Sequence, residues 1–155
     1  MKAPPFEYLS DLPTPVQPVA REHHATVPGE VVSYSDDRRE RGARLMRELT
    51  GDAAETVVRG LRDIAPDLAN WIVEFAYGDV MARPGLDRRS RQLATIAALT
   101  ALGNAQPQLK VHIQGALNAG CKPQEIVEVI LQMAVFAGFP AAINALNVAR
   151  EVLPR

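Results

Sequence analysis

One histidine, His112, lies among small residues in the apolar second half of the chain. An imidazole titrates near pH 6.5, so at neutral pH it can accept or donate a proton. On a helix, its neighbours three, four and seven residues later are Gly115, Ala116 and Ala119, which leave space beside the ring. His112 is therefore a candidate general acid or base. The same small residues are also compatible with close helix packing around a structural histidine that bonds to a carbonyl.

A carboxylate, Glu74, lies at the edge of an apolar helical stripe that contains Trp71 and Phe75, and Gly78 follows one turn later. A carboxylate in this position can orient or polarise a histidine, or bind a substrate proton. We therefore predict that Glu74 is the partner of His112. The alternative is that Glu74 belongs to a solvated helix face.

The run Asp87-Arg88-Arg89-Ser90-Arg91 places three arginines at the predicted start of a helix, and Arg83 lies just upstream. Cations at a helix N-terminus oppose the macrodipole by roughly 0.3–1 kcal/mol each. An anionic ligand, bound by guanidinium groups and free backbone amides, would explain this arrangement. Pairing of the arginines with Asp87, Asp79 or Glu74 is the alternative.

Helices must position these residues, because no segment shows the alternation typical of a β-strand. Capping residues, prolines suited to a first turn and glycines after the last turn mark the helix boundaries. The sequence therefore predicts an all-α fold, a compact bundle of about seven helices. These helices run from Ser35 to Leu49, Asp52 to Leu61, Pro66 to Val80, Arg88 to Leu102, Pro107 to Gly120, Pro123 to Gly138 and Pro140 to Leu153.

The apolar faces of these helices predict how they pack. Residues 93–102 are apolar nearly all round, so this helix is expected to be central and buried. Residues 126–136 are also almost entirely apolar, and a chain of 155 residues cannot easily cover two such helices. Burial between subunits of a homo-oligomer is the expected solution. In the helix from Pro66, the apolar stripe consists of Leu68, Trp71, Ile72 and Phe75.

Residues 1–34 differ from the remainder of the chain, because they contain six of its twelve prolines together with many apolar residues. Proline blocks helix formation, so this segment is predicted to be an extended arm that lies on a folded surface. The predicted organisation is thus an arm over residues 1–34 and a helical domain over residues 35–155. The adjacent pair His23-His24 is by itself only a weak indication of metal binding.

Composition excludes several classes of function. The formal net charge of −1 argues against a nucleic-acid binder, and the single cysteine, Cys121, rules out an intrachain disulfide or a CxxC pair. No apolar run is long enough to span a bilayer, and the first residues lack the apolar core of a secretory signal. We therefore expect a cytoplasmic protein with no membrane partner, in which Cys121 is structural.

Two segments carry a family resemblance: VEFAYGDVMARPGLDRRSRQLATIAALTALGN and HIQGALNAGCKPQEIVEVILQMAVFAGFPAAINALNVA. They resemble the carboxymuconolactone decarboxylase family, and the first is most similar to its decarboxylase branch. The resemblance implies a compact all-α fold that assembles into trimers or hexamers. In the peroxidase-like branch, a CxxC motif precedes the histidine that His112 matches. Here Ala105 and Gln108 replace those cysteines, and Gln92 stands near the proton-relay glutamate, so thiol peroxidase chemistry is not expected.

The resemblance further implies decarboxylation of a small anionic substrate, a lactone bearing carboxylates, with no metal or organic cofactor. Such chemistry needs cations to anchor carboxylates, an apolar wall around the departing group and an acid to protonate the carbanion. The residues predicted for these roles are His112 and Glu74 as the catalytic pair, Arg83, Arg89 and Arg91 as anion anchors, and Trp71, Phe75 and Phe136 as the apolar wall.

Three functions follow as hypotheses. The first is a cofactor-independent decarboxylase acting on a small carboxylated lactone or a related enolisable acid. The second is an enzyme of the same fold that catalyses a proton transfer, cyclisation or isomerisation without loss of carbon dioxide. The third is a non-catalytic ligand-binding or assembly protein, because a shared fold does not fix function.

Overall fold

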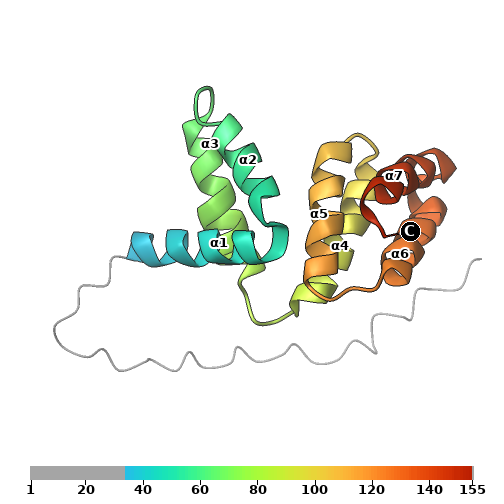
Figure 1. The fold of residues 1–155 in the computed structure, drawn as a ribbon, viewed down its shortest axis with the longest axis horizontal. Coiled ribbons are helices and arrows are strands. Elements are labelled where there is room, and N and C mark those ends of the chain that lie inside the picture. Colours follow the sequence, from blue (N-terminus) through green and yellow to red (C-terminus); the bar gives the residue numbers. More distant parts are fainter. Residues whose placement is uncertain (1–33, 155) are drawn as a thin grey trace, which may run out of the picture. The chain divides into compact units, whose positions relative to one another are not determined.

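A computed structural model describes residues 34–154, so nearly all of the predicted arm and the His23-His24 pair lie outside the described residues. The described part of the chain contains seven α-helices and no strand, and a π-helical segment continues the third helix (Figure 1). This confirms the predicted all-α fold. The elements are α1 (Tyr34–Thr50), α2 (Asp52–Gly60), α3 (Pro66–Trp71), η2 (Ile72–Met81), α4 (Arg88–Leu102), α5 (Gln106–Asn118), α6 (Pro123–Ala137) and α7 (Phe139–Val152).

Local signals in the sequence set the helix boundaries. Asp87 caps α4, because its carboxylate accepts hydrogen bonds from the backbone nitrogen and the hydroxyl of Ser90. Gly103 ends the same helix with a φ of 73°, a conformation that favours glycine. Prolines occupy the first turns of α3, α5, α6 and α7. Between residues 34 and 154, no helix is both long and apolar enough to cross a membrane.

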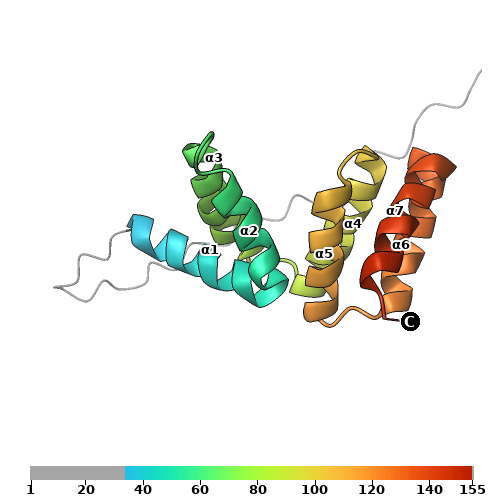
Figure 2. The ribbon, with the colours of Figure 1, turned by 45° about the horizontal axis from the view of Figure 1, so that its top comes forward.

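The core consists of two clusters of buried side chains. The N-terminal cluster joins α1, α2, α3 and η2, and it includes Leu45, Val58 and Tyr77. The C-terminal cluster joins α4 to α7, which lie side by side in Figures 1 and 2, and its centre includes Ile96 and Ile113. Helix α5 packs against α1 as well as against α4 and α7, so it contacts both clusters. His112 lies on this shared helix.

The structure corrects the apolar stripe predicted for the helix from Pro66. Its buried residues are Ala69, Val73 and Tyr77, whereas Trp71 is 61% exposed and Phe75 is 59% exposed. The reason is the packing against α1, because the close contacts of Val73 and Gly78 with that helix turn this face of the segment toward the core. The helix also becomes a π-helix at Ile72, where hydrogen bonds run from residue i to i+5 and each turn is wider.

The expectation that α4 is buried all round is also wrong for the single chain. Gln92, Ile96 and Thr100 are buried, but Leu102 and the small residues on the opposite face are exposed. Helix α6 likewise buries Ile126 and Ile130 and leaves its other side open. Each helix therefore contributes one face to the core and presents a second apolar face at the surface of the described chain.

Two glycines allow α1 and η2 to cross at close range. A Cβ atom on Gly42 would overlap the carbonyl oxygen of Val73, and a Cβ atom on Gly78 would lie 2.6 Å from the carbonyl oxygen of Arg38. Both contacts involve backbone atoms, which cannot move without shifting a helix. Since η2 supplies Tyr77 and Met81 to the candidate site described below, this crossing fixes one side of that site.

We expect the substitution Gly42→Ala to lower the free energy of unfolding by about 1–3 kcal/mol or more, because it forces the two helices apart. Gly60→Ala is the matched control, since a Cβ atom there has no neighbour within 4 Å. This control is expected to leave stability unchanged or to raise it by about 0.4–1 kcal/mol. Urea unfolding of the three proteins measures both effects. Equal stability of the two variants would contradict the proposed steric role of Gly42.

Candidate active site

Gln92 holds the ring of His112 in place. The amide oxygen of Gln92, on α4, lies 3.0 Å from Nδ1 of His112, on α5. Because an amide oxygen can only accept, this pairing places the imidazole proton on Nδ1. The Nε2 atom then carries the free lone pair, so it is the nitrogen able to accept a proton from another group.

The small residue Gly115 makes room for this contact. A Cβ atom at Gly115 would lie 3.2 Å from the amide nitrogen of Gln92, which is tighter than an ordinary contact. Gln92 is 0% exposed, and its amide nitrogen has no hydrogen-bond partner among the described residues. The space that the sequence predicted beside His112 on this side is thus occupied by the Gln92 side chain.

A cavity of about 330 Å³ lies beside His112, and we call it the His112 cavity. Its walls come from α2, η2, α4 and α5, and most of the lining side chains are apolar, including Val58, Ile72 and Val111. Polar groups in the lining come from His112, Tyr77, Thr95 and Gln108, and no arginine or lysine of the described chain lines it. Met81 and Thr95 also line a neighbouring cavity of about 340 Å³ along α4.

Burial changes the acid–base properties of two groups that line the His112 cavity. Burial lowers the pKa of His112 below its usual value of 6.5, because the charged imidazolium is poorly solvated there. Burial also raises the pKa of Tyr77 above its usual value of 10.0, and the side chain of Thr50 opposes part of this shift. Near neutral pH, the cavity therefore contains a neutral imidazole and a protonated phenol.

The depressed pKa of His112 predicts a pH-dependent stability. Between the folded pKa and 6.5, the unfolded chain binds more protons at this residue than the folded chain does. The free energy of unfolding is therefore expected to fall as the pH decreases from about 6.5 through the folded pKa. We expect His112→Gln to lack this component, so its stability should decline less on acidification than that of the wild type. Urea unfolding at a series of pH values measures the difference, and identical pH dependence in both proteins would contradict the prediction.

The structure does not bring Glu74 to His112. Glu74 forms an ion pair of 3.5 Å with Arg39 on α1, and it does not line the His112 cavity. Trp71, Phe75 and Phe136 also lie outside the lining of this cavity, and their side chains are largely exposed. The apolar lining comes instead from other residues of η2 and from α2 and α5.

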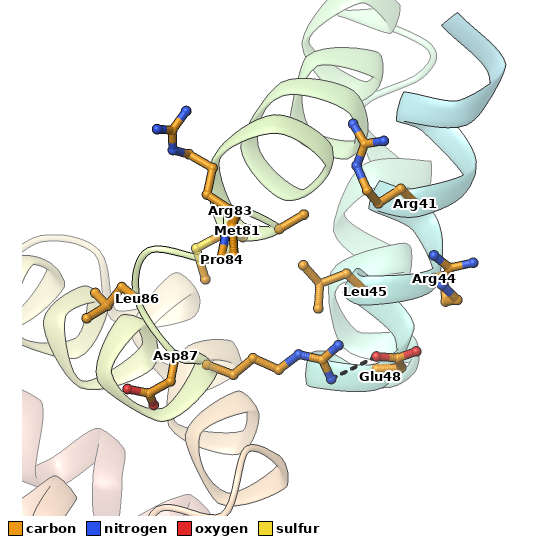
Figure 3. A pocket seen from close by; sticks show the side chains of 11 residues that line it. Arg41, Arg44, Leu45, Glu48, Met81, Arg83, Pro84, Leu86 and Asp87 are labelled. Atoms are coloured by element: carbon orange, nitrogen blue, oxygen red, sulfur yellow. Dashed lines mark ion pairs between the residues drawn. The ribbon is translucent and has the colours of Figure 1, made fainter. Parts of the chain in front are cut away.

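The three arginines predicted to anchor an anion have different surroundings. Arg89 donates to both carboxylate oxygens of Glu125 at 2.7 Å, which links α4 to the start of α6. Arg91 donates to the carbonyl oxygens of Leu86 and Arg83, so it holds the loop before α4. The side chain of Arg83 lines a separate pocket, shown in Figure 3. None of the three lines the His112 cavity.

Cys121 is buried, and its thiol lies 3.8 Å from the carbonyl oxygen of Arg89, to which it donates. Burial raises the pKa of this thiol, so the reactive thiolate form is disfavoured. This environment fits the structural role predicted for Cys121.

Several residues of the site were not predicted from the sequence. Gln92 stands near the position of a family glutamate but was not expected to contact His112, and no role was predicted for Tyr77, Thr95 or Gln108. One usable signal was present, because a glutamine on the buried side of an apolar helix needs a polar partner. The other three lie on three different helices, and no local pattern shows that they share one cavity.

The family of the chain follows from its similarity to known proteins. A family model described as "Carboxymuconolactone decarboxylase family" matches residues 66–151, which include η2, Gln92 and His112. The chain belongs to the carboxymuconolactone decarboxylase family. This membership confirms the resemblance inferred from the two sequence segments.

Individual proteins are similar to this chain over much of their length. The 4-carboxymuconolactone decarboxylase of Acinetobacter baylyi is 36% identical over 118 residues, which cover 76% of this chain and 87% of that protein. The nitrosuccinic acid decarboxylase of Metarhizium robertsii is 34% identical over 115 residues, 72% of this chain and 78% of that protein. An uncharacterized 15.0 kDa protein of Paracoccus denitrificans is 38% identical over 96 residues, 61% of this chain and 72% of that protein. The names of these two decarboxylases thus refer to different substrates.

Proposed function

We propose that this protein is a decarboxylase that acts on a small carboxylated lactone or a related enolisable acid, with His112 as its general acid and base. Family membership and two relatives named as decarboxylases support the reaction type. The observation that carries the proposal for the site is the pairing of His112 with Gln92 beside an apolar cavity of about 330 Å³.

The proposed reaction breaks the bond between the α-carbon and the carboxylate. Carbon dioxide departs, and the electron pair of the broken bond delocalises toward the carbonyl of the substrate. Nε2 of His112 takes up a proton, from the substrate acid or from solvent, and delivers it to the carbanion. One substrate carboxylate and one proton are consumed, and one carbon dioxide and one C–H bond are formed.

The surroundings of the cavity favour this sequence of events. Apolar side chains disfavour the concentrated charge of a carboxylate more than the delocalised charge of the developing carbanion. Tyr77, which keeps its proton at neutral pH, is suited to donate a hydrogen bond to the carbonyl oxygen as negative charge develops there. The low pKa of His112 makes its imidazolium a strong acid once it is formed.

The proposal includes a homo-oligomer, a trimer or hexamer. Its support is a group of exposed apolar side chains at the end of α6 and the start of α7, of which Val135 is 79% exposed. Exposed apolar surface of this kind is typical of subunit interfaces. The group consists of Leu131, Val135, Phe136, Phe139 and Ile143.

A second candidate function is a proton transfer, such as lactone isomerisation, without loss of carbon dioxide. It is favoured by the absence of any cationic side chain in the described lining of the His112 cavity. A neutral lactone needs no such cation, whereas a substrate that retains a carboxylate after reaction would gain from one.

The experiment that tests the proposal measures carbon dioxide directly. The full chain is incubated with 4-carboxymuconolactone and, separately, with nitrosuccinic acid, and both substrate consumption and carbon dioxide release are recorded. We expect one carbon dioxide per substrate consumed for at least one acid of this class. Consumption without carbon dioxide would support the second candidate and overturn the first. Binding without consumption across a panel of such acids would favour the non-catalytic hypothesis.

A further inference from the structure

The described lining of the His112 cavity is neutral near pH 7. Burial lowers the pKa of His112 and raises the pKa of Tyr77, and the other two polar side chains, Thr95 and Gln108, carry no charge. We propose that the substrate of this cavity is a 3-oxo acid with an apolar body and a single carboxylate, the one that is lost. This inference rests on the proposed decarboxylation and narrows its substrate class. The apolar lining residues are Ala54, Val57, Val58, Ile72, Ala76, Met81, Pro107 and Val111.

The two carboxylates of a dicarboxylic substrate would differ in the fate of their charge. The carboxylate that leaves becomes carbon dioxide, so its poor solvation in an apolar cavity is relieved as the bond breaks. A carboxylate that the product retains keeps its charge throughout, so the same poor solvation weakens binding without speeding the reaction. The apolar and neutral side chains of the described lining therefore favour a substrate with one carboxylate.

The arginines of the neighbouring elements lie in other surroundings. Arg39, on α1, pairs with Glu74 at 3.5 Å and lines a different pocket of about 200 Å³. Arg91, on α4, donates to two backbone carbonyl oxygens of the loop before that helix. Arg83 and Arg88 line the pocket of Figure 3. A second carboxylate in the His112 cavity would thus lie against neutral side chains.

The hydrogen-bond donors of the lining match one carbonyl group and one carboxylate. The hydroxyl of Thr95 already donates to the carbonyl oxygen of Arg91 at 2.9 Å, so Thr95 can only accept from a ligand. The side-chain donors left for a ligand are the phenol of Tyr77 and the amide of Gln108, which lies one turn before His112 on α5. A 3-oxo acid uses both, the phenol for the 3-oxo oxygen and the amide for the leaving carboxylate.

The volume of the cavity limits the apolar body to a short chain or a single ring. At about 30 Å³ per non-hydrogen atom, the share of one water molecule in the liquid, 330 Å³ holds about eleven such atoms. A 3-oxo acid with a seven-carbon chain matches this size. In its reaction the bond between carbons 1 and 2 breaks, and the electron pair passes into the enolate. Nε2 of His112 then delivers a proton to carbon 2, so the acid and one proton become carbon dioxide and a methyl ketone.

The test compares two acids that differ only at carbon 7, 3-oxoheptanoate and 3-oxoheptanedioate. Carbon dioxide release by the full chain is measured for both, after subtraction of the uncatalysed rate. We expect kcat/KM to be at least about tenfold higher for the monocarboxylate, because the diacid retains a poorly solvated charge. An equal or higher value for the diacid would overturn the proposal.

A cation introduced beside the apolar body is expected to change this preference. Val57 lines the cavity from α2 and is 46% exposed, so an arginine there can keep its charge hydrated. We expect Val57→Arg to raise kcat/KM for the diacid relative to the monocarboxylate by about tenfold. Thr56→Arg is the matched control, because Thr56 has a similar shape and is exposed on the same helix, outside the described lining. The same change in both variants would overturn the assignment to this cavity.

Binding of the products separates this inference from the proposed reaction. The two acids would give 2-hexanone and 5-oxohexanoate, which have the same chain length and carbonyl position, but only the second is charged. We expect 2-hexanone to shift the imidazole NMR signals of His112 in a saturable manner and 5-oxohexanoate to bind at least about tenfold more weakly. This preference, without carbon dioxide release from any acid, would uphold the selection against a second charge and overturn the proposed reaction. Equal or tighter binding of 5-oxohexanoate, or no binding of 2-hexanone, would overturn the selection itself.

Discussion

Replacing His112 by glutamine is expected to lower kcat/KM for decarboxylation by about 10²–10⁴, the usual contribution of a positioned acid or base. Glutamine fills part of the ring's space and can still bond to Gln92, but it cannot take up and return a proton at neutral pH. The effect should therefore appear in the chemical step and not in the folding of the chain. Rates of carbon dioxide release from the best substrate measure it.

The matched control for this experiment is on the same helix. Lys110 is exposed on α5 and forms an ion pair of 2.7 Å with Glu151, away from the His112 cavity. Lys110→Gln is expected to retain the activity of the wild type. Glu74→Gln completes the set, because it tests the predicted catalytic partner that the structure places beside Arg39. Full activity of the His112 variant would remove the proposed mechanism.

The second large effect is expected from Gln92→Glu, which changes the partner of Nδ1 from a neutral amide to a carboxylate. An opposite charge at hydrogen-bond distance stabilises the imidazolium, so the pKa of His112 should rise by about 1–3 units. The acid form of His112 would then persist to higher pH. The falling limb of the pH–rate profile is expected to move to higher pH by the same amount. NMR titration of the imidazole would show the raised pKa of His112 directly.

A positioning role for Gln92 is separated from a merely structural one by a second variant. Gln92→Leu keeps the side chain at a similar size but makes it apolar, and so removes the acceptor for Nδ1–H. We expect this variant to have a lower kcat, because neither the tautomer nor the orientation of the His112 ring is then fixed. Its pH–rate profile is not expected to move to higher pH. If Gln92→Glu folds normally and its profile coincides with that of the wild type, Gln92 does not act through His112.

The fold was predictable because its signals are local. The cap at Asp87, the glycine at position 103 and the prolines in the first turns each act within a few residues, and the structure places helix boundaries at all of them. The face of η2 was not predictable in this way. Its π-helical turn accompanies the close crossing at Gly42 and Gly78, and such a crossing depends on backbone atoms far apart in the sequence.

In the candidate site, too, local features were predictable and contacts between distant residues were not. His112 stood out by its type and its small neighbours, and the structure places a cavity beside it. Its contact is Gln92, twenty residues earlier, and the predicted partner Glu74 instead faces Arg39. Similarly, Arg91 was predicted to bind the anionic substrate, but it donates hydrogen bonds to two carbonyl oxygens of the loop before α4. Charge and spacing identify residues able to do chemistry, whereas the helix packing decides which of them meet.

Met81 occupies an unusual place, because it lines the His112 cavity, the pocket between α1 and the loop before α4 (Figure 3), and the apolar cavity along α4. A thioether on three rotatable bonds adapts readily to whatever surrounds it. Space gained in one hollow by rotation of this side chain is lost from another. A change in the rotamer of Met81 would therefore alter the volume of all three spaces at once.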